Sequence, residues 1–282
     1  MREVDILIIG GGAAGIAAAK GAYKAGCRSI AIVDRKKALG GVLLQCLHRG
    51  FGQNQNGPEY TQTLLEGFPE EILVMDNTTV LSVTKEKTAC LSGAEAVRFQ
   101  QLILATGCRE IPMGALPIGG TRPRGVYTAG QMQEMMNLYG YLPEGPAVIL
   151  GSGDLGLVMA NHLAQAGIPV TLIEKKPLCG GMARNQRCLE HGLVGLICNA
   201  TVTQVQGETQ LEGCILSTGE VLPCKTLLIA VGLVPDRELV LENADWLHVC
   251  GNCNRVHPMV EAVIKEGNLA GIAAWKQIRG NL

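Results

Sequence analysis

Residues 5–35 read DILIIGGGAAGIAAAKGAYKAGCRSIAIVDR, a pattern that predicts a strand, a glycine turn, a helix and a second strand ending in an acid. The apolar run Ile6–Ile9 suits a parallel strand buried on both faces, and glycines end it abruptly. Gly10, Gly12 and Gly15 have the spacing G-x-G-x-x-G. In such a loop one glycine allows a tight turn, one lets the backbone approach a pyrophosphate, and one allows close packing of helix on strand.

The helix after these glycines would point its unpaired N–H groups and the positive end of its dipole at a diphosphate. Asp34 follows the last glycine by about 20 residues, a spacing that suits a carboxylate bonded to ribose hydroxyls. Ala14 and Arg35 flank these positions and belong to the same predicted site. The stretch therefore predicts a dinucleotide-binding half-domain.

The same order of strand, glycine loop, helix, strand and acid recurs later in the chain. A short apolar strand, 147–150, leads to a second glycine loop, and a strand over 170–173 ends in Glu174. A second dinucleotide site follows from this repeat, because chance seldom reproduces the full order of elements. The carboxylate of Glu174 would repel a 2′-phosphate and so favours NADH over NADPH, although Lys175 and Lys176 weaken that preference. The loop residues of this second site are Gly151, Gly153, Asp154, Leu155 and Gly156.

Composition excludes several classes of function. The chain has 282 residues, 37 of them glycine, and a formal net charge of -1. Without a basic stripe, neither nucleic acid nor an acidic membrane is an expected partner. The apolar runs have strand length and the first strand begins near residue 5, so we expect no secretory signal, no membrane insertion and a cytoplasmic protein.

Eleven cysteines are scattered through the sequence. In a chain too long to need disulfide staples, most are better interpreted as reduced, small core residues. Cys250 and Cys253 form one C-x-x-C, but no second pair completes a four-thiolate zinc site, and we predict no metal site.

Between the two glycine loops the sequence predicts further close backbone approaches. Gly40 and Gly41 open a segment that should run beside the ligand, and a buried strand over 99–104 ends in the small residues Ala105, Thr106 and Gly107. Three short strands, at 72–75, 79–84 and 88–91, suggest a small antiparallel excursion. Prolines and glycines over 112–125 suggest a linker and a domain boundary.

Taken together, these motifs resemble the pyridine nucleotide-disulfide oxidoreductase superfamily. The resemblance rests on both glycine loops, the ATG at 105–107, the GLVP turn that begins at Gly232, and Gly251-Asn252 before a helix. The length resembles the compact, thioredoxin-reductase-like members. Three stretches, GGVLLQCLHRGFG, TRPRGVYTAGQ and CGNCNRVHPMVEAVIKEGNLAG, are similar to small oxidoreductase subunits of opine oxidase, hydrogen cyanide synthase and anaerobic glycerol-3-phosphate dehydrogenase complexes.

The resemblance implies an α/β fold with two Rossmann-like domains, in which an NAD domain is inserted into an FAD domain. It places FAD binding in residues 1–112 and 236–282 and NAD(P)H binding in residues 113–235. The first loop, Gly41, the ATG segment, Gly251 and Asn252 would then contact FAD, while the second loop and Gly232 belong to the NAD(P)H side.

Two departures from the family pattern affect the expected chemistry. Neither of the family's disulfide active sites is present, since the segment before the second loop lacks cysteine and the segment directly after Gly40 and Gly41 has only one, Cys46. The aspartate that commonly binds the ribityl chain of FAD is replaced by Asn252, whose amide can still bond a hydroxyl. The helix that starts near Val260 would aim N–H groups at the flavin pyrimidine.

No catalytic residue can be named from the sequence, but four candidates have two interpretations each. Cys46 and His48 lie on the loop expected to pass the flavin, as a redox or proton-transfer pair or as packing residues. Cys250 and Cys253 either form a reactive pair at a strand-to-helix junction or flank the flavin-binding turn as small structural residues.

The function we predict is FAD-dependent transfer of a hydride between NAD(H) and flavin. With no second redox centre in the chain, electrons must leave to an external acceptor. The resemblance favours a dehydrogenase partner in a multisubunit complex, and a homo-oligomer is also open. Two alternatives are a thiol-disulfide oxidoreductase that uses Cys250 and Cys253, and a non-catalytic nucleotide-binding scaffold.

Overall fold

The computed structural model describes residues 1–239 and 244–280. The chain divides into two compact units, Met1–Arg109 with Val234–Leu282, and Glu110–Leu233. It passes from one unit to the other at β7 (Cys108–Glu110) and returns at β17 (Leu233–Pro235), and these two strands pair with each other. Within the described ranges, no helix combines the length and the apolar character needed to cross a bilayer.

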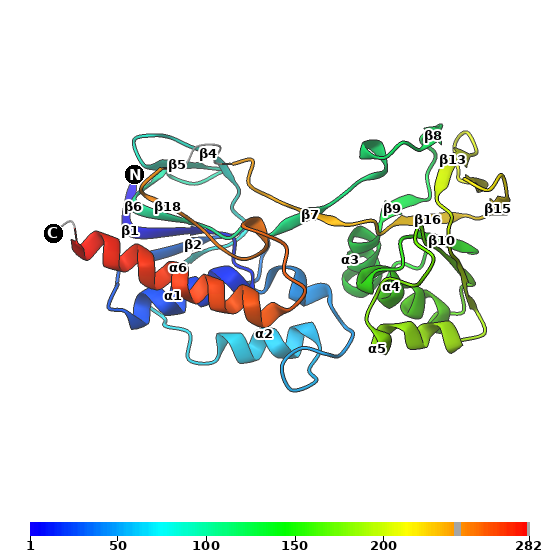
Figure 1. The fold of residues 1–282 in the computed structure, drawn as a ribbon. Helices are drawn as coiled ribbons and strands as arrows, with labels where there is room; N and C mark the ends of the chain where they lie inside the picture. Colours follow the sequence, from blue (N-terminus) through cyan, green and yellow to red (C-terminus); the bar gives the residue numbers. More distant parts are fainter. Residues whose placement is uncertain (240–243, 281–282) are drawn as a thin grey trace. The chain divides into compact units, whose positions relative to one another are not determined.

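The first unit is built on one sheet with the strand order β3-β2-β1-β6-β5-β4 and with β18 beside β6 (Figure 1). Its elements are β1 (Arg2–Ile9), α1 (Ala13–Lys24), β2 (Ile30–Val33), η1 (Gly41–Gln45), α2 (Gly57–Leu65), β3 (Leu73–Met75), β4 (Val80–Val83), β5 (Thr88–Leu91), β6 (Val97–Leu104), β18 (Leu247–Val249), η4 (Gly251–Cys253) and α6 (Val260–Gly280).

The expected antiparallel excursion of three strands is wrong in one respect. Of the three strands, only β4 and β5 form antiparallel pairs. β4 pairs with β5, and β5 pairs with β6. β3 instead lies parallel to β2, with Val74 opposite Ile32, and extends the parallel sheet at its edge. Strand composition alone cannot assign such a short edge strand, because its direction depends on the path of the preceding α2 segment.

The apolar run Ile6–Ile9 of strand β1 is buried on both faces, as predicted. Ile6 and Ile8 face the cluster formed with α1 and α6, whereas Leu7 and Ile9 face a second cluster that includes residues of β4, β5 and β18. The alternation follows from the two-residue period of a strand. The sheet thereby holds the start of α1 at the carboxyl end of β1.

Helices α1 and α6 pack against each other at backbone contact. A Cβ on Gly267 would overlap the carbonyl oxygen of Ala14, and a Cβ on Gly271 would overlap that of Ala18. Glycines four residues apart on α6 thus face alanines four residues apart on α1, and the spacing puts each set on one helix face. Helix α6 is therefore an integral part of the first unit.

The second unit repeats the arrangement with a sheet of order β12-β11-β10-β16-β9 and a smaller sheet of order β15-β14-β13-β8. Its elements are η2 (Met113–Ala115), β8 (Gly119–Gly120), β9 (Val126–Thr128), α3 (Ala129–Tyr139), β10 (Ala147–Leu150), α4 (Asp154–Gln165), β11 (Val170–Ile173), α5 (Ala183–Gln186), η3 (Arg187–Glu190), β12 (Val194–Ile197), β13 (Val202–Gln206), β14 (Gly213–Leu216), β15 (Val221–Pro223) and β16 (Thr226–Ile229).

The first of these sheets is parallel at every pairing, from β12 through to β9. Ala147 and Ile149 of β10 face the core that includes α3 and α4, while Val148 and Leu150 face the core shared with the smaller sheet. Each unit therefore has the layered α/β architecture that was predicted, with a glycine loop at the carboxyl end of its central strand.

Candidate cofactor-binding site

The first glycine loop connects β1 to α1, and its outer glycines are required by the protein itself. Gly10 has φ +104°, and a Cβ there would overlap the carbonyl oxygen of Ala105. A Cβ on Gly15 would overlap the carbonyl oxygen of Gly10. A left-handed turn and a close helix approach therefore explain these two positions without any ligand.

The middle glycine of the motif has no such explanation. Gly12 has the ordinary backbone angles φ -76° and ψ -171° and forms the N-cap of α1 without a side-chain cap. A Cβ there would meet only the Cα of Gly41, at an ordinary contact distance of 3.9 Å. The protein would tolerate a side chain at this position, so the glycine leaves open space at the positive end of a helix.

Asp34 is bonded to the same loop. Its Oδ2 accepts the N–H of Gly11 at 2.6 Å, and its Oδ1 accepts the N–H of Lys36 at 2.7 Å. The side chain is half-buried, whereas Arg35 is exposed. The carboxylate thus lies beside the glycine loop, and one of its tasks is to hold the loop itself.

Two further segments close around this loop. Gly40 donates its N–H to the carbonyl of Gly11 at 2.8 Å, and a Cβ on Gly41 would lie 3.0 Å from the Cα of Gly12. On the other side, Ala105 passes Gly10 at backbone contact. The close approaches expected at 40–41 and 105–107 are therefore approaches to the glycine loop.

The ATG segment is anchored at its far end by the returning chain. The hydroxyl of Thr106 donates to the carbonyl of Asp236 at 2.5 Å, and the N–H of Asp236 donates to the carbonyl of Gly107 at 3.0 Å. Gly107 has φ +82° and has no atom within 4 Å of a notional Cβ. Its left-handed conformation is reason enough for glycine.

The second loop reproduces the first, residue by residue. Gly151 has φ +108° and passes the carbonyl of Ala230, and a Cβ on Gly156 would overlap the carbonyl oxygen of Gly151. Gly153, the counterpart of Gly12, has φ -66° and is the N-cap of α4 without a side-chain cap. A Cβ on Gly153 would have nothing within 4 Å. Here too, packing does not require the middle glycine.

Glu174 is the counterpart of Asp34 and is 9% exposed. Its Oε2 accepts the N–H and the hydroxyl of Ser152, at 3.1 and 2.5 Å, and its Oε1 accepts the N–H of Lys176 at 2.9 Å. Burial opposes the charge, but these hydrogen bonds outweigh it and lower the pKa of the Glu174 carboxyl. A negative charge therefore persists at this position near neutral pH.

Other predicted residues of the second unit have structural partners. Asp154 begins α4, and its Oδ1 accepts the N–H of Met182 at 2.8 Å and the side-chain amide of Asn185 at 2.6 Å. Leu155 packs at the edge of the core that includes α3 and α4. Gly232, with φ +146°, follows β16, and its carbonyl accepts the N–H of Ile111 at 3.2 Å.

The turn after β18 lies over the start of α1. Gly251 has φ +70°, and a Cβ there would lie 2.7 Å from the Cβ of Ala14 and 3.2 Å from a methyl of Val263. Asn252 follows, and α6 begins at Val260. The C-terminal motif is thereby brought to the glycine loop of β1 and α1, although the sequence between them spans nearly the whole chain.

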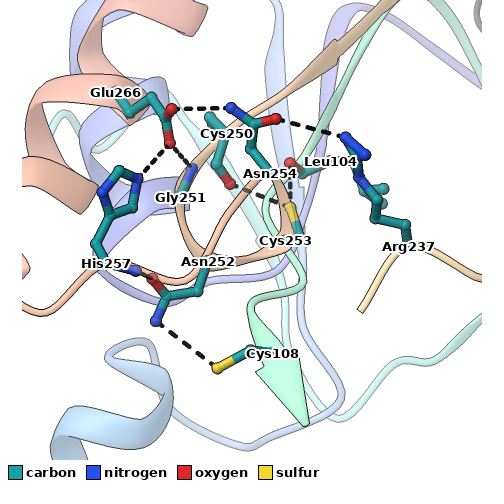
Figure 2. Close-up of polar contacts among 10 residues, drawn as sticks. All are labelled: Leu104, Cys108, Arg237, Cys250, Gly251, Asn252, Cys253, Asn254, His257 and Glu266. Carbon is teal, nitrogen blue, oxygen red and sulfur yellow. Dashed lines mark hydrogen bonds and ion pairs between the residues drawn. The ribbon is translucent and has the colours of Figure 1, made fainter. Parts of the chain in front are cut away.

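Side-chain hydrogen bonds tie this turn together (Figure 2). Glu266 of α6 accepts from the N–H of Gly251 at 2.7 Å, the ring nitrogen of His257 at 3.0 Å and the amide of Asn254 at 2.9 Å. Burial opposes its charge, but these donors together lower the pKa of the Glu266 carboxyl. Asn252 accepts the N–H of His257 at 3.0 Å and directs its amide nitrogen at the sulfur of Cys108, 3.7 Å away.

The four catalytic candidates differ in accessibility. Cys250 and Cys253 are both 0% exposed, and the thiol of Cys253 donates to the carbonyls of Leu104 and Cys250. Burial raises the pKa of the Cys250 thiol, and neither thiol is accessible to solvent, so the pair lacks the accessibility of a reactive site. This geometry supports the structural interpretation of the pair. Among the described residues, no group of His, Cys, Asp and Glu is placed to hold a metal ion.

Cys46 is also buried, with its thiol directed at the carbonyl of Val42 at 3.3 Å, and burial raises its pKa to about 12. His48 is half-buried, and its ring lies 5.2 Å from that of Phe51. Because burial disfavours the thiolate that a redox or proton-transfer pair would need, this environment supports packing as the role of Cys46.

Several residues of this region escaped the sequence analysis. Gly11 and Ser152 hold the acids of the two loops, and His257 and Glu266 hold the C-terminal turn. Of these four residues, only Gly11 and Ser152 could have been found from the sequence, because they occupy equivalent positions inside the two glycine motifs. Nothing in the spacing of His257 and Glu266 distinguishes them from exposed polar residues.

The donor set of the two loops fits dinucleotides. Each loop offers helix N-terminal N–H groups, a glycine that leaves space beside them, and a carboxylate at the end of the next strand. The architecture defines a two-unit α/β protein with a glycine loop of the dinucleotide-binding type in each unit. Residues 4–250 match the model of the pyridine nucleotide-disulphide oxidoreductase family, and the chain belongs to this family. The family depends on FAD and NAD(P).

Curated relatives confirm the predicted resemblance to subunits of opine oxidase and hydrogen cyanide synthase. The opine oxidase relative, a subunit from Agrobacterium tumefaciens (strain Ach5), is 33% identical over 200 residues, which cover 64% of this chain and 39% of the relative. The hydrogen cyanide synthase relative, HcnB of Pseudomonas protegens, is 31% identical over 193 residues, covering 64% and 40%. This chain thus matches well under half the length of either relative.

Among solved structures, thioredoxin reductase of T. acidophilum superimposes with a TM-score of 0.80 at 20% identity, covering 99% of this chain and 100% of that one. This similarity confirms the predicted thioredoxin-reductase-like fold.

Proposed function

We propose that the first unit binds FAD and the second unit binds NADH, and that the protein transfers a hydride between them. For FAD the contacts are assigned to the first glycine loop, Asp34, Gly41, the ATG segment and the turn at Gly251-Asn252. For NADH they are assigned to the second loop with Glu174 and Gly232. At the C-terminal turn, Asn252 replaces a more common aspartate, and its amide retains the capacity to bond a hydroxyl.

The single observation that carries the proposal is the pair of middle glycines. At Gly12 and Gly153 the backbone angles are ordinary and a Cβ would meet no clash. The free space adjoins a helix N-terminus in both units, which suits the close approach of a diphosphate. Packing inside the loops does not require glycine at these two positions.

Flavin, once bound, supplies the hydride chemistry, so the protein's task is to position the two cofactors and to exclude competing reactions. The persistent charge of Glu174 would repel the 2′-phosphate of NADPH and accept hydrogen bonds from the ribose of NADH. The chain residues thereby set which nicotinamide cofactor is accepted.

We further propose that electrons pass to an acceptor outside this chain, on a partner dehydrogenase subunit. The support is that the opine oxidase and hydrogen cyanide synthase relatives are named as subunits, and that Cys250 and Cys253 are too buried to act as an internal redox centre. A thiol acceptor within the C-terminal turn would need an exposed, low-pKa thiolate.

An anaerobic titration of the FAD-loaded protein with NADH and NADPH tests the proposal. NADH should bleach the visible band of the flavin at close to one equivalent, while NADPH should require a concentration at least tenfold higher, an order of magnitude expected for one charge repulsion. A flavin that NADH fails to reduce would contradict the proposed transfer.

A further inference from the structure

Outside the glycine loops, a cluster of connected polar side chains lies at the turn before α6 (Figure 2). One carboxylate, that of Glu266, accepts three hydrogen bonds from the segment 251–257, and it is 27% exposed while the ring of His257 is 7% exposed. Glu266 lies near the end of the second turn of α6, so it ties the turn to the helix that follows.

The cluster also fixes the orientation of the side-chain amide of Asn252. The side-chain oxygen of Asn252 accepts the N–H of His257, so its NH₂ group points the other way, toward Cys108. Exchanging oxygen and nitrogen would set two donors against each other. Asn252 is therefore held as a hydrogen-bond donor, on the side of the turn away from His257.

We propose that Glu266 and His257 are positioning residues for the flavin: they hold the Gly251-Asn252 turn so that the amide of Asn252 is presented to the ribityl chain. This inference rests on the proposed function, since it presumes that FAD binds to the first unit. It assigns the two residues to the flavin half of the site, whereas the glycine loop and Asp34 serve the adenosine diphosphate half.

The charge of Glu266 is what makes the arrangement possible. A carboxylate has only acceptors, and all three of its partners are donors. Gly251 and His257 share one oxygen of Glu266, and Asn254 bonds the other. A glutamine of the same shape would therefore set its NH₂ group either against Asn254 or against Gly251 and His257 together, and the turn would loosen although the side chain would still fit.

The test compares FAD binding with ADP binding at the same site. The apo-protein is titrated with FAD by fluorescence, and ADP is then used to displace FAD, so that the ADP constant reports on this site alone. Glu266→Gln should weaken FAD binding by roughly tenfold or more, the effect of a charged hydrogen bond. The inhibition constant for ADP should stay within about twofold, because ADP lacks the ribityl chain to which the amide of Asn252 is proposed to be presented.

His257→Gln provides a second, milder variant and should weaken FAD binding in the same selective way. The double variant should lose little more than Glu266→Gln alone, because the two residues act through one contact network. Glu70→Gln, which changes an exposed carboxylate of the same unit, is the matched control and should bind both ligands like the wild type.

Two results would overturn the inference while the proposed function stands: a Glu266→Gln protein that binds FAD as tightly as the wild type, or variants that lose FAD and ADP in equal proportion. The second result would indicate a general structural defect. A wild-type protein that fails to bind FAD would instead overturn the proposed function itself.

Discussion

Ser152 donates both its backbone N–H and its hydroxyl to one oxygen of Glu174, at 3.1 and 2.5 Å. At the equivalent point of the first unit, Gly11 gives Asp34 only a backbone N–H. The second loop therefore binds its acid more firmly, and it does so in a more buried setting. The hydroxyl also accepts the N–H of Gly180 at 2.9 Å, which joins a third segment to the pair.

Ser152→Ala should lower the free energy of unfolding by about 1–3 kcal/mol near neutral pH, because a buried carboxylate loses a donor. The pKa of Glu174 is lowered in the folded state, so its contribution is present above its unfolded pKa and lost as pH falls through the folded value. The difference between variant and wild type should therefore shrink in acid.

Urea unfolding of both proteins from neutral pH downwards measures this difference. Ser82→Ala, at an exposed position of β4, serves as the control. A loss of stability that is the same at every pH would show that the hydroxyl does not act through the charge of Glu174.

The middle and last glycines of the second loop should separate binding from folding. Gly153→Ala adds a Cβ to open space, so the apo-protein should lose no more than about 1 kcal/mol, while NADH binding should weaken at least tenfold, an order expected where a backbone must approach a phosphate. Gly156→Ala drives a Cβ into the carbonyl of Gly151 and should cost roughly 1–3 kcal/mol or more of stability.

Unfolding of the apo-proteins and NADH binding by fluorescence together distinguish the two positions. If Gly153→Ala bound NADH like the wild type, the open space beside α4 would not be a diphosphate site.

The contact of α1 with α6 should tolerate no added methyl group. Gly271→Ala would place a Cβ on the carbonyl of Ala18 and should lower the melting temperature by several degrees, since roughly 1–3 kcal/mol of overpacking is expected. Gly280→Ala is the control on the same helix, because a Cβ there has nothing within 4 Å. Calorimetry of both variants checks this, and equal melting temperatures would contradict the packing.

The buried thiols should be unreactive in the folded protein. Iodoacetamide at mildly alkaline pH should leave Cys250 and Cys253 unmodified until the protein is denatured, because both are inaccessible and burial raises the pKa of Cys250. The half-exposed Cys90 serves as the internal reference for accessible thiol. Peptide mass spectrometry gives the result, and rapid labelling of either buried thiol would revive the thiol-disulfide alternative.

The glycine loops could be predicted from sequence because their geometry is local. Gly10 and Gly15 contact each other across one turn, and Asp34 is at the end of the next strand. The same holds for Gly151, Gly156 and Glu174. Each motif carries its strand, helix and acid within about 30 residues, so spacing alone was enough.

Features that depend on distant segments could not be predicted in the same way. The backbone contact of Gly267 with Ala14 joins segments near the two ends of the chain, and neither residue type predicts such a partner. The bonds of Glu266 to Gly251 and His257 depend on how the turn folds back over α6. The predicted direction of β3 was wrong for a similar reason, because the path of the chain around α2 decides the direction of that strand.

The most direct test of the central claim is the stoichiometry of FAD on the purified protein. Apo-protein mixed with excess FAD and passed through a desalting column should retain one FAD per chain, and Gly12→Val, which fills the space at the start of α1, should retain far less. A wild-type protein that emerges colourless would contradict the claim that its first unit is a flavin site.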